Sequence, residues 1–146
     1  MTCIAYRDGL LAADTLITDE DGCKIGYARK IRKTEDGCLA GASGDCDYCA
    51  QFMEWVVTDR TTKTPKQGKG DSSILITPDR KIYYFYGRTS DILLQDYIAI
   101  GAGTPFAMAA FFNNADAIKA VETAIQFHGF CGGDIMTERL ENVCKI

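Results

Sequence analysis

The residue with the clearest chemical potential is Thr2, which follows Met1 at the start of the sequence. A small second residue permits removal of Met1, which would leave a hydroxyl and a free α-amino group on one residue. Because a terminal α-amine has a pKa of about 8, much of it is neutral at cellular pH and can accept the hydroxyl proton. Thr2 is therefore a candidate nucleophile that carries its own base, although the first six residues taken alone favour an ordinary residue at the start of a first strand.

Two charged residues are candidates to assist Thr2. Asp14 ends the second apolar run of the sequence, and Lys30 lies among apolar neighbours such as Ala28 and Ile31. A lysine inside a sheet layer needs a carboxylate partner, and Asp14 is the obvious one. A cation near Thr2 would lower the pKa of the terminal amine and stabilise a developing alkoxide.

A third feature is the segment Gly41-Ala42-Ser43-Gly44, which runs from an apolar strand into a helix. Backbone N–H groups at a helix N-terminus point outward and can hold a negatively charged oxygen. Gly44 is therefore a candidate oxyanion donor.

The elements that must position these residues are mainly short antiparallel strands. Apolar runs at residues 3–7 and 10–14 are joined by Asp8-Gly9, a strong hairpin signal. Residues 14–26 are polar and predict a loop with at most one short strand. Further strands are predicted at residues 27–33, 38–42, 73–77, 81–86, 97–101, 134–140 and 143–146.

Helices are predicted in the middle of the chain. Helical spacing of apolar residues indicates helices that open near Ser43 to Asp45, at Gly103-Thr104-Pro105 and at Asp116. The basic, polar residues 58–70 predict a mobile loop. Strands first, helices next and strands last indicate an α+β fold in which two antiparallel sheets are covered by helices on the outside.

Length and composition narrow the class of protein. A sequence of 146 residues with 47% hydrophobic and 25% charged residues predicts one globular domain. The net charge of -4 gives no sign of the excess of basic residues that is typical of nucleic-acid-binding proteins. We expect a cytoplasmic protein, since no apolar run is long enough to span a membrane and the start lacks a secretory signal. The seven cysteines are then expected to be reduced thiols.

The sequence gives weaker support for several other chemistries. Cys46 and Cys49 form the single CxxC, but no second pair completes a zinc site, so we expect no metal and no cofactor. Cys131 and His128 could form a nucleophile pair, yet a packing histidine and a buried cysteine are the simpler interpretation. The acidic run at residues 19–21 is more typical of solvated surface than of a cation site.

Taken together, the motifs resemble the proteasome β-subunit family and the bacterial HslV-type peptidases. The matching segments are Thr2, LAAD at residues 11–14, KI at 30–31, LAGASG at 39–44 and IAIGAGTPFAMAA at 98–110. They occur in family order and at similar spacings over nearly the whole chain.

The resemblance implies a four-layer αββα sandwich, the N-terminal nucleophile hydrolase fold, and threonine peptidase activity. Carried over by motif, Thr2 is the nucleophile, Asp14 and Lys30 are the charged pair, and the Gly44 N–H is the oxyanion donor. The residues implied to line the first specificity pocket are Ile17, Ala28, Ala42 and Cys46. Their small, apolar side chains suggest an apolar residue before the cleaved bond.

The sequence also departs from the family pattern. Ala102 stands where the family usually has a serine, and His128 and Cys131 replace auxiliary residues that orient the terminal amine. The chain is short around residues 58–72, where relatives carry a further helix. Two interpretations remain open: a peptidase that acts on peptides or unfolded proteins, or a catalytically silent assembly module. The resemblance also implies a homo-oligomeric ring, to which exposed Trp55, Phe111 and Phe112 could contribute, and a possible unfoldase or cap as partner.

Overall fold

The computed structural model describes residues 2–87 and 89–141. Its strands form two antiparallel sheets and one separate hairpin. The first sheet has the order β10-β1-β2-β11 and consists of Tyr97–Ile100, Ile4–Arg7, Leu10–Ala13 and Met136–Arg139. The second has the order β5-β6-β7-β8-β9 and consists of Ile31–Lys33, Leu39–Ser43, Ser72–Ile76, Ile82–Tyr86 and Thr89–Leu93. The hairpin pairs β3 (Leu16–Thr18) with β4 (Lys24–Tyr27).

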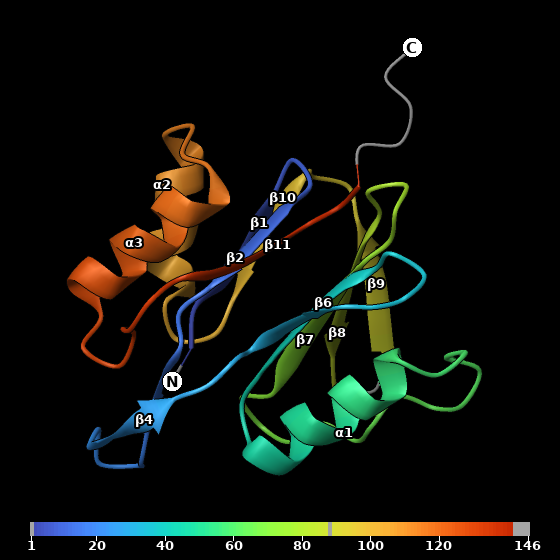
Figure 1. Ribbon diagram of the computed structural model, residues 1–146, viewed down its shortest axis with the longest axis horizontal. Coiled ribbons are helices and arrows are strands. Elements are labelled where there is room, and N and C mark those ends of the chain that lie inside the picture. The colour runs from blue at the N-terminus through green and yellow to red at the C-terminus, as the bar shows by residue number, and fades with distance from the viewer. Residues whose placement is uncertain (1, 88, 142–146) are drawn as a thin grey trace.

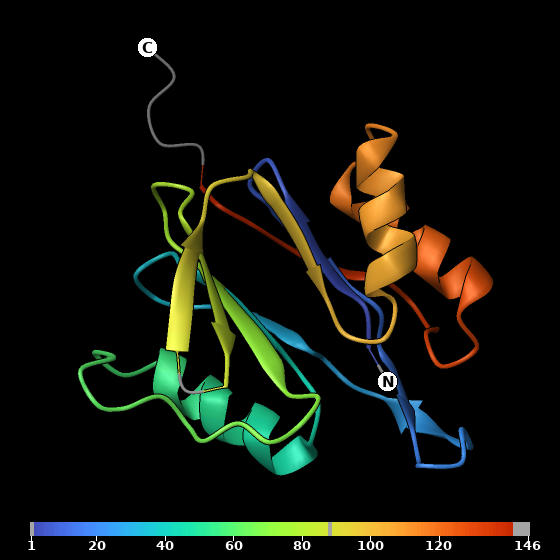
Figure 2. The same cartoon turned by 180° about the vertical axis from the view of Figure 1, so that it is seen from behind.

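The helices cover the outer faces of the two sheets. Helices α2 (Thr104–Phe112) and α3 (Ala117–Phe127) pack on the first sheet, and α1 (Cys46–Val56) packs on the second. Figure 1 shows the resulting order of layers, and Figure 2 shows the same arrangement from behind. The predicted four-layer αββα sandwich is confirmed.

Strand β1 shows how the sequence specifies these layers. Side chains here alternate between two cores: Ile4 and Tyr6 face the second sheet, whereas Ala5 and Cys3, the residue just before the strand, face α2 and α3. Because both faces are buried, the strand reads as a continuous apolar run rather than as an alternating one.

The first hairpin has the predicted turn. Residues Asp8 and Gly9 both have positive φ, of 51° and 81°, as a two-residue hairpin turn requires. The register pairs Ile4 with Ala13 and Arg7 with Leu10, so Asp14 follows directly beside the start of β1.

Other expectations need correction. The strand predicted at residues 27–33 is interrupted at residues 28–30, because β4 and β5 belong to different sheets. Strand β9 was not predicted, since only Ile92 and Leu93 are apolar in it and its residues are largely exposed. Residues 143–146, predicted as a final strand, lie outside the described residues.

The expected exposure of the aromatic residues is also partly wrong. Phe111 is only 2% exposed and packs against Tyr97 with a ring-centroid distance of 5.4 Å. Phe112 is 85% exposed, because the next position on α2 points away from the sheet. Trp55 is half-buried and contacts Phe52 and Phe85.

Candidate active site

A fully buried carboxylate organises one side of the site. Asp14 is 0% exposed, and its Oδ1 accepts hydrogen bonds from the Cys3 N–H at 2.9 Å and from Lys30 Nζ at 2.9 Å. Its Oδ2 accepts from the Gly132 N–H at 3.0 Å. The ion pair predicted between Asp14 and Lys30 is therefore present, and backbone donors satisfy the rest of the carboxylate.

Lys30 reaches this carboxylate from a position that differs from the expected one. It lies immediately before β5 rather than in the middle of a strand, and its side chain is 6% exposed. Its Nζ also donates to the Leu16 carbonyl at 2.7 Å. The break between β4 and β5 thus lets the lysine turn into the space beside β3.

The backbone around Thr2 is fixed from two directions. The Thr2 carbonyl accepts a hydrogen bond from the Gly103 N–H at 3.1 Å, and the next N–H, that of Cys3, is bound by Asp14. Gly101 approaches Thr2 so closely that an added Cβ would lie 2.7 Å from the Thr2 carbonyl carbon. Gly101 also has a φ of +95°, so glycine is needed there on both grounds.

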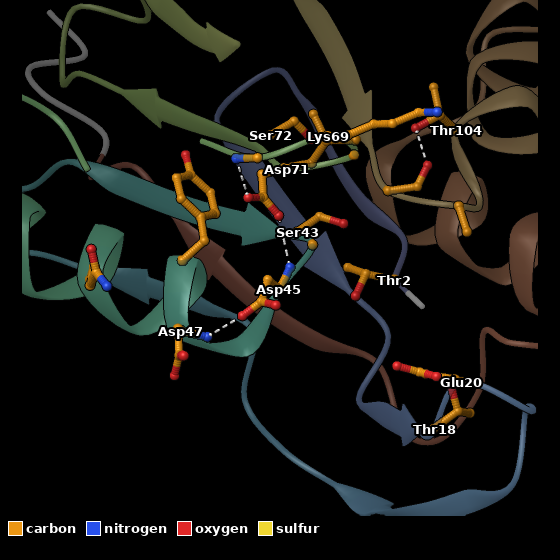
Figure 3. A pocket seen from close by; sticks show the side chains of 18 of the residues that line it. Thr2, Thr18, Glu20, Ser43, Asp45, Asp47, Lys69, Asp71, Ser72 and Thr104 are labelled. Carbon is orange, nitrogen blue, oxygen red and sulfur yellow. Dashed lines mark hydrogen bonds between the residues drawn. The ribbon is translucent and has the colours of Figure 1, made fainter. Parts of the chain in front are cut away.

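Thr2 lies where two cavities meet. The smaller cavity, which we call the apolar cavity, has a volume of about 300 Å³ and contains Lys30 and Gly44 in its lining together with Thr2. The larger cavity, which we call the cleft, has a volume of about 950 Å³ and is shown in Figure 3. The structure thus brings the candidate nucleophile, cation and oxyanion donor to one place.

Three of the four residues implied to form the specificity pocket line the apolar cavity. They are Ile17, Ala42 and Cys46. Ala28 is not among the described residues that line either cavity: it is exposed beside the β3–β4 hairpin, where its N–H donates to the Thr15 carbonyl at 2.8 Å. Sequence reasoning missed the face of α1 that continues from Cys46 and adds Cys49, Ala50 and Met53 to the lining. Their spacing after Cys46 is helical, and this was the signal that could have identified them.

The cleft is more polar than the apolar cavity. Its lining includes hydroxyl groups, carboxylates and two lysines, namely Ser43, Ser72, Thr104, Asp19, Glu20, Asp45, Asp47, Asp71, Lys66 and Lys69. Peptide backbone and polar side chains can be accommodated along such a surface.

Gly44 and Asp45 are the two residues that connect β6 to α1. The Gly44 φ of +124° is rarely adopted by other residues. The following residue, Asp45, is the N-cap of α1 and accepts a hydrogen bond from the Asp47 N–H at 2.8 Å. Among the described residues, the Gly44 N–H donates to no backbone carbonyl in a turn or helix cap. The Asp45 N–H, by contrast, donates to the Asp71 carboxylate. The Gly44 N–H is thus one of the donors open to a ligand at the start of α1, and Gly44 lines both cavities.

His128 and Cys131 are not among the described residues that line the two cavities. His128 caps the end of α3, its Nδ1 accepts from the Phe130 N–H at 3.1 Å, and its ring contacts Phe106. Cys131 is buried in the core under α2 and α3, and burial raises the pKa of its thiol to about 11. Neither is among the described residues lining the cavity that contains Thr2 and Lys30.

The position expected to carry a serine is open to the cleft. Ala102 lines it without a hydroxyl, while the neighbouring Thr104 hydroxyl donates to the Gly101 carbonyl at 2.7 Å. The hydroxyls of Ser43 and Thr104 both lie near Gly101 in this loop.

Within residues 2–87 and 89–141, no cluster of three or more histidine, cysteine, aspartate or glutamate side chains is arranged to hold a metal ion. Nor does that part of the chain contain a helix with the length and apolarity needed to cross a membrane.

Comparison with known proteins gives similarity in structure but not in sequence. No family model and no curated protein matches the sequence. The structure of eukaryotic HslV from Trypanosoma brucei is similar, with a TM-score of 0.72 and 20% identity over 97% of this chain and 100% of that chain. BPH from Thiobacillus denitrificans in complex with epoxomicin has a TM-score of 0.70 and 18% identity over 96% and 98% of the two chains.

A second BPH structure from the same organism has a TM-score of 0.64 and 19% identity over 97% of this chain and 98% of that chain. These likenesses extend over nearly the whole length of each chain, so the order and layering of the elements agree throughout. The chain therefore has the N-terminal nucleophile hydrolase fold of HslV, and the resemblance inferred from its motifs is confirmed at the level of structure.

Proposed function

We propose that this protein is a threonine-type N-terminal nucleophile hydrolase that cleaves peptide bonds after removal of Met1, within a single proteasome β-like domain. The observation that carries the proposal is the common cavity lined by Thr2, Lys30 and Gly44. A nucleophile, a cation and a free N–H at one place are the groups that acyl transfer requires.

Each residue then has a role. The free amine of Thr2 takes the proton from its own hydroxyl, and Oγ1 attacks the carbonyl carbon of the scissile bond. Lys30, held in place by Asp14 and the Leu16 carbonyl, stabilises the developing negative charge. The Gly44 N–H donates to the oxyanion of the tetrahedral intermediate. Collapse expels the amine product, which takes a proton from the Thr2 ammonium, and water hydrolyses the remaining ester.

The apolar cavity supports a preference for an apolar side chain before the cleaved bond. Its lining by Ile17, Ala42 and Met53 offers aliphatic contacts, and a volume of about 300 Å³ has room for one such side chain. The substrates would be peptides or unfolded proteins, which can lie extended along the cleft.

The proposal extends to assembly. HslV-type proteins suggest a homo-oligomeric ring in the cytoplasm, fed by an unfoldase or cap, and the exposed Phe112 supplies an apolar contact. Light scattering at micromolar concentration checks this part, because a purely monomeric mass would exclude a stable ring.

A catalytically silent module is the second candidate. It is favoured by Ala102, which lacks a hydroxyl, and by His128, which packs against Phe106 rather than lining the cavity with Thr2. Without groups that orient the terminal amine, the fold could serve assembly alone.

Hydrolysis of a fluorogenic peptide with an apolar residue before the cleaved bond separates the two candidates. We expect Thr2→Ala to reduce turnover to background and Thr2→Ser to retain part of it, because serine keeps both the hydroxyl and the amine. Cys23→Ser is the control, since Cys23 is an exposed thiol that lines neither cavity. Undiminished hydrolysis by Thr2→Ala would remove Thr2 as the nucleophile.

A further inference from the structure

One side chain just before the neighbouring strand β7 holds the turn that contains Gly44. Asp71 precedes β7, and its Oδ1 accepts a hydrogen bond from the Asp45 N–H at 2.8 Å. Its Oδ2 accepts from the Gly68 N–H at 2.7 Å. Figure 3 shows the Asp71 carboxylate lying over the start of α1, at the edge of the cleft that also contains Thr2. The carboxylate therefore connects two segments of backbone that are far apart in the sequence.

The contact between Asp71 and Gly44 is too close for any side chain at position 44. A Cβ added to Gly44 would lie 2.8 Å from the Asp71 Cα and would collide with Oδ1. The positive φ of Gly44 and this close approach occur at the same residue, so position 44 requires glycine on both grounds.

The same short segment holds the turn on both sides of Gly44. Ser43 pairs with Ser72 in the antiparallel ladder of β6 and β7, and Asp45 is bound by Asp71. With the residue before it and the residue after it both fixed, Gly44 has little freedom to rotate its N–H.

We propose that Asp71 is a positioning residue for the hydrolase: it fixes the Gly44–Asp45 turn so that the Gly44 N–H points at the developing oxyanion. The proposal rests on the proposed function for its catalytic consequence, and on the two hydrogen bonds of Asp71 for its geometry. Because the Asp45 N–H is occupied by Asp71, it does not compete with the Gly44 N–H as a donor for substrate.

The role of Asp71 is geometric rather than electrostatic. A carboxylate near an oxyanion would oppose the developing negative charge, so a favourable charge effect cannot explain its position. Asparagine has one acceptor oxygen in place of two and can keep only one of the two hydrogen bonds. Asp71→Asn therefore removes half of the clamp while it preserves shape and reduces negative charge.

The kinetic test compares Asp71→Asn with Asp79→Asn. Asp79 also accepts a side-chain hydrogen bond in a turn, from Thr77, but it lies in the β7–β8 turn away from the cleft. We expect Asp71→Asn to lower kcat for peptide hydrolysis by about 10-fold to 100-fold with little change in KM, since a misplaced donor weakens transition-state binding. Asp79→Asn should leave both values unchanged.

A second probe separates the oxyanion donor from the nucleophile. A peptide vinyl sulfone reacts by addition: Thr2 Oγ1 bonds to the β-carbon, its proton goes to the α-carbon, and no carbonyl oxyanion forms. Labelling of Thr2 by this probe should therefore proceed at nearly the wild-type rate in Asp71→Asn. Equal loss of labelling and hydrolysis, or wild-type kcat, would overturn the proposal.

Amide hydrogen exchange tests the clamp without any need for activity. In the unmodified protein, the Asp45 and Gly68 amides should exchange slowly although both residues are exposed. In Asp71→Asn, at least one of them should exchange about 10-fold faster, and Asp79→Asn should change neither. Fast exchange at both amides in the unmodified protein would overturn the clamp. Slow exchange in a protein with no hydrolysis and no labelling would instead refute the proposed function, and the catalytic role of Asp71 with it.

Discussion

Asp14 and Asp71 each hold a segment of backbone beside Thr2, but in different surroundings. Asp14 is 0% exposed and binds an ammonium and two backbone N–H groups. Asp71 is half-buried and binds two backbone N–H groups at the edge of the cleft. A buried charge is costly to leave without its partner, whereas a hydrogen bond near solvent is partly replaced by water. Changes at Asp14 should therefore mainly lower the stability of the fold, and changes at Asp71 should mainly lower the rate of peptide hydrolysis.

The largest effect is expected from Asp14→Asn. The substitution leaves the Lys30 ammonium buried without a carboxylate, and we expect a loss of about 3–5 kcal/mol in the free energy of unfolding. Urea denaturation measures this loss, and Asp71→Asn serves as the comparison, with an expected loss of about 1 kcal/mol. Equal destabilisation by the two substitutions would mean that burial does not distinguish the two carboxylates.

Lys30→Met should cost less than Asp14→Asn. The Asp14 carboxylate would still accept hydrogen bonds from the Cys3 and Gly132 N–H groups, so its charge would remain partly compensated. Combining the two substitutions should recover part of the loss, because neither charge is then left alone. Urea denaturation of both single variants and the double variant gives the coupling energy. Additive losses would show that the two side chains act independently.

Gly44→Ala tests the turn that the Asp71 carboxylate holds. The positive φ and the contact with Asp71 predict a loss of about 1–3 kcal/mol and a fall in peptide hydrolysis. Gly26→Ala is the matched control, since a Cβ there would meet nothing within 4 Å. Thermal unfolding of both variants measures the difference. If Gly44→Ala were as stable and active as Gly26→Ala, the close fit between Gly44 and Asp71 would have no energetic consequence.

The smallest effect concerns the reactivity of the thiols. It compares Cys131, in the core under α2 and α3, with exposed cysteines. Burial raises the pKa of Cys131 to about 11, so at about pH 8 almost none of it is thiolate. Cys23 and Cys46 are exposed. Iodoacetamide followed by peptide mass spectrometry should therefore modify these two at least about 100-fold faster than Cys131, and modification of Cys131 should increase as the pH rises toward its pKa. Rapid modification of Cys131 near neutral pH would support the discarded Cys131 nucleophile.

The residues that sequence reasoning placed well are those whose environment restricts the choice. A lysine among apolar neighbours needs a carboxylate, and this requirement predicts the pair of Lys30 and Asp14 that the structure contains. The positive φ values at Asp8-Gly9 follow from a turn that few other residue pairs can make.

The residues that were missed depend on tertiary contacts. Asp71 lies in a polar segment without periodicity, and nothing local indicates that it reaches Asp45. Ala28 was expected in the specificity pocket. It is exposed instead, because it lies in the segment that connects β4 in one sheet to β5 in another. Strand β9 pairs with β8 through backbone hydrogen bonds, which its polar, exposed side chains do not reveal.

The most direct test of the account is the site of modification by a peptide epoxyketone, an electrophile that requires both a hydroxyl and a free amine on one residue. Natively expressed protein is treated with the reagent, and intact mass and peptide mapping locate the adduct. We predict that the chain lacks Met1 and carries one adduct on Thr2, and that Thr2→Ala carries none. A population that retains Met1 and stays unmodified, or an adduct on Cys46 in place of Thr2, would contradict the assignment of Thr2 as the nucleophile.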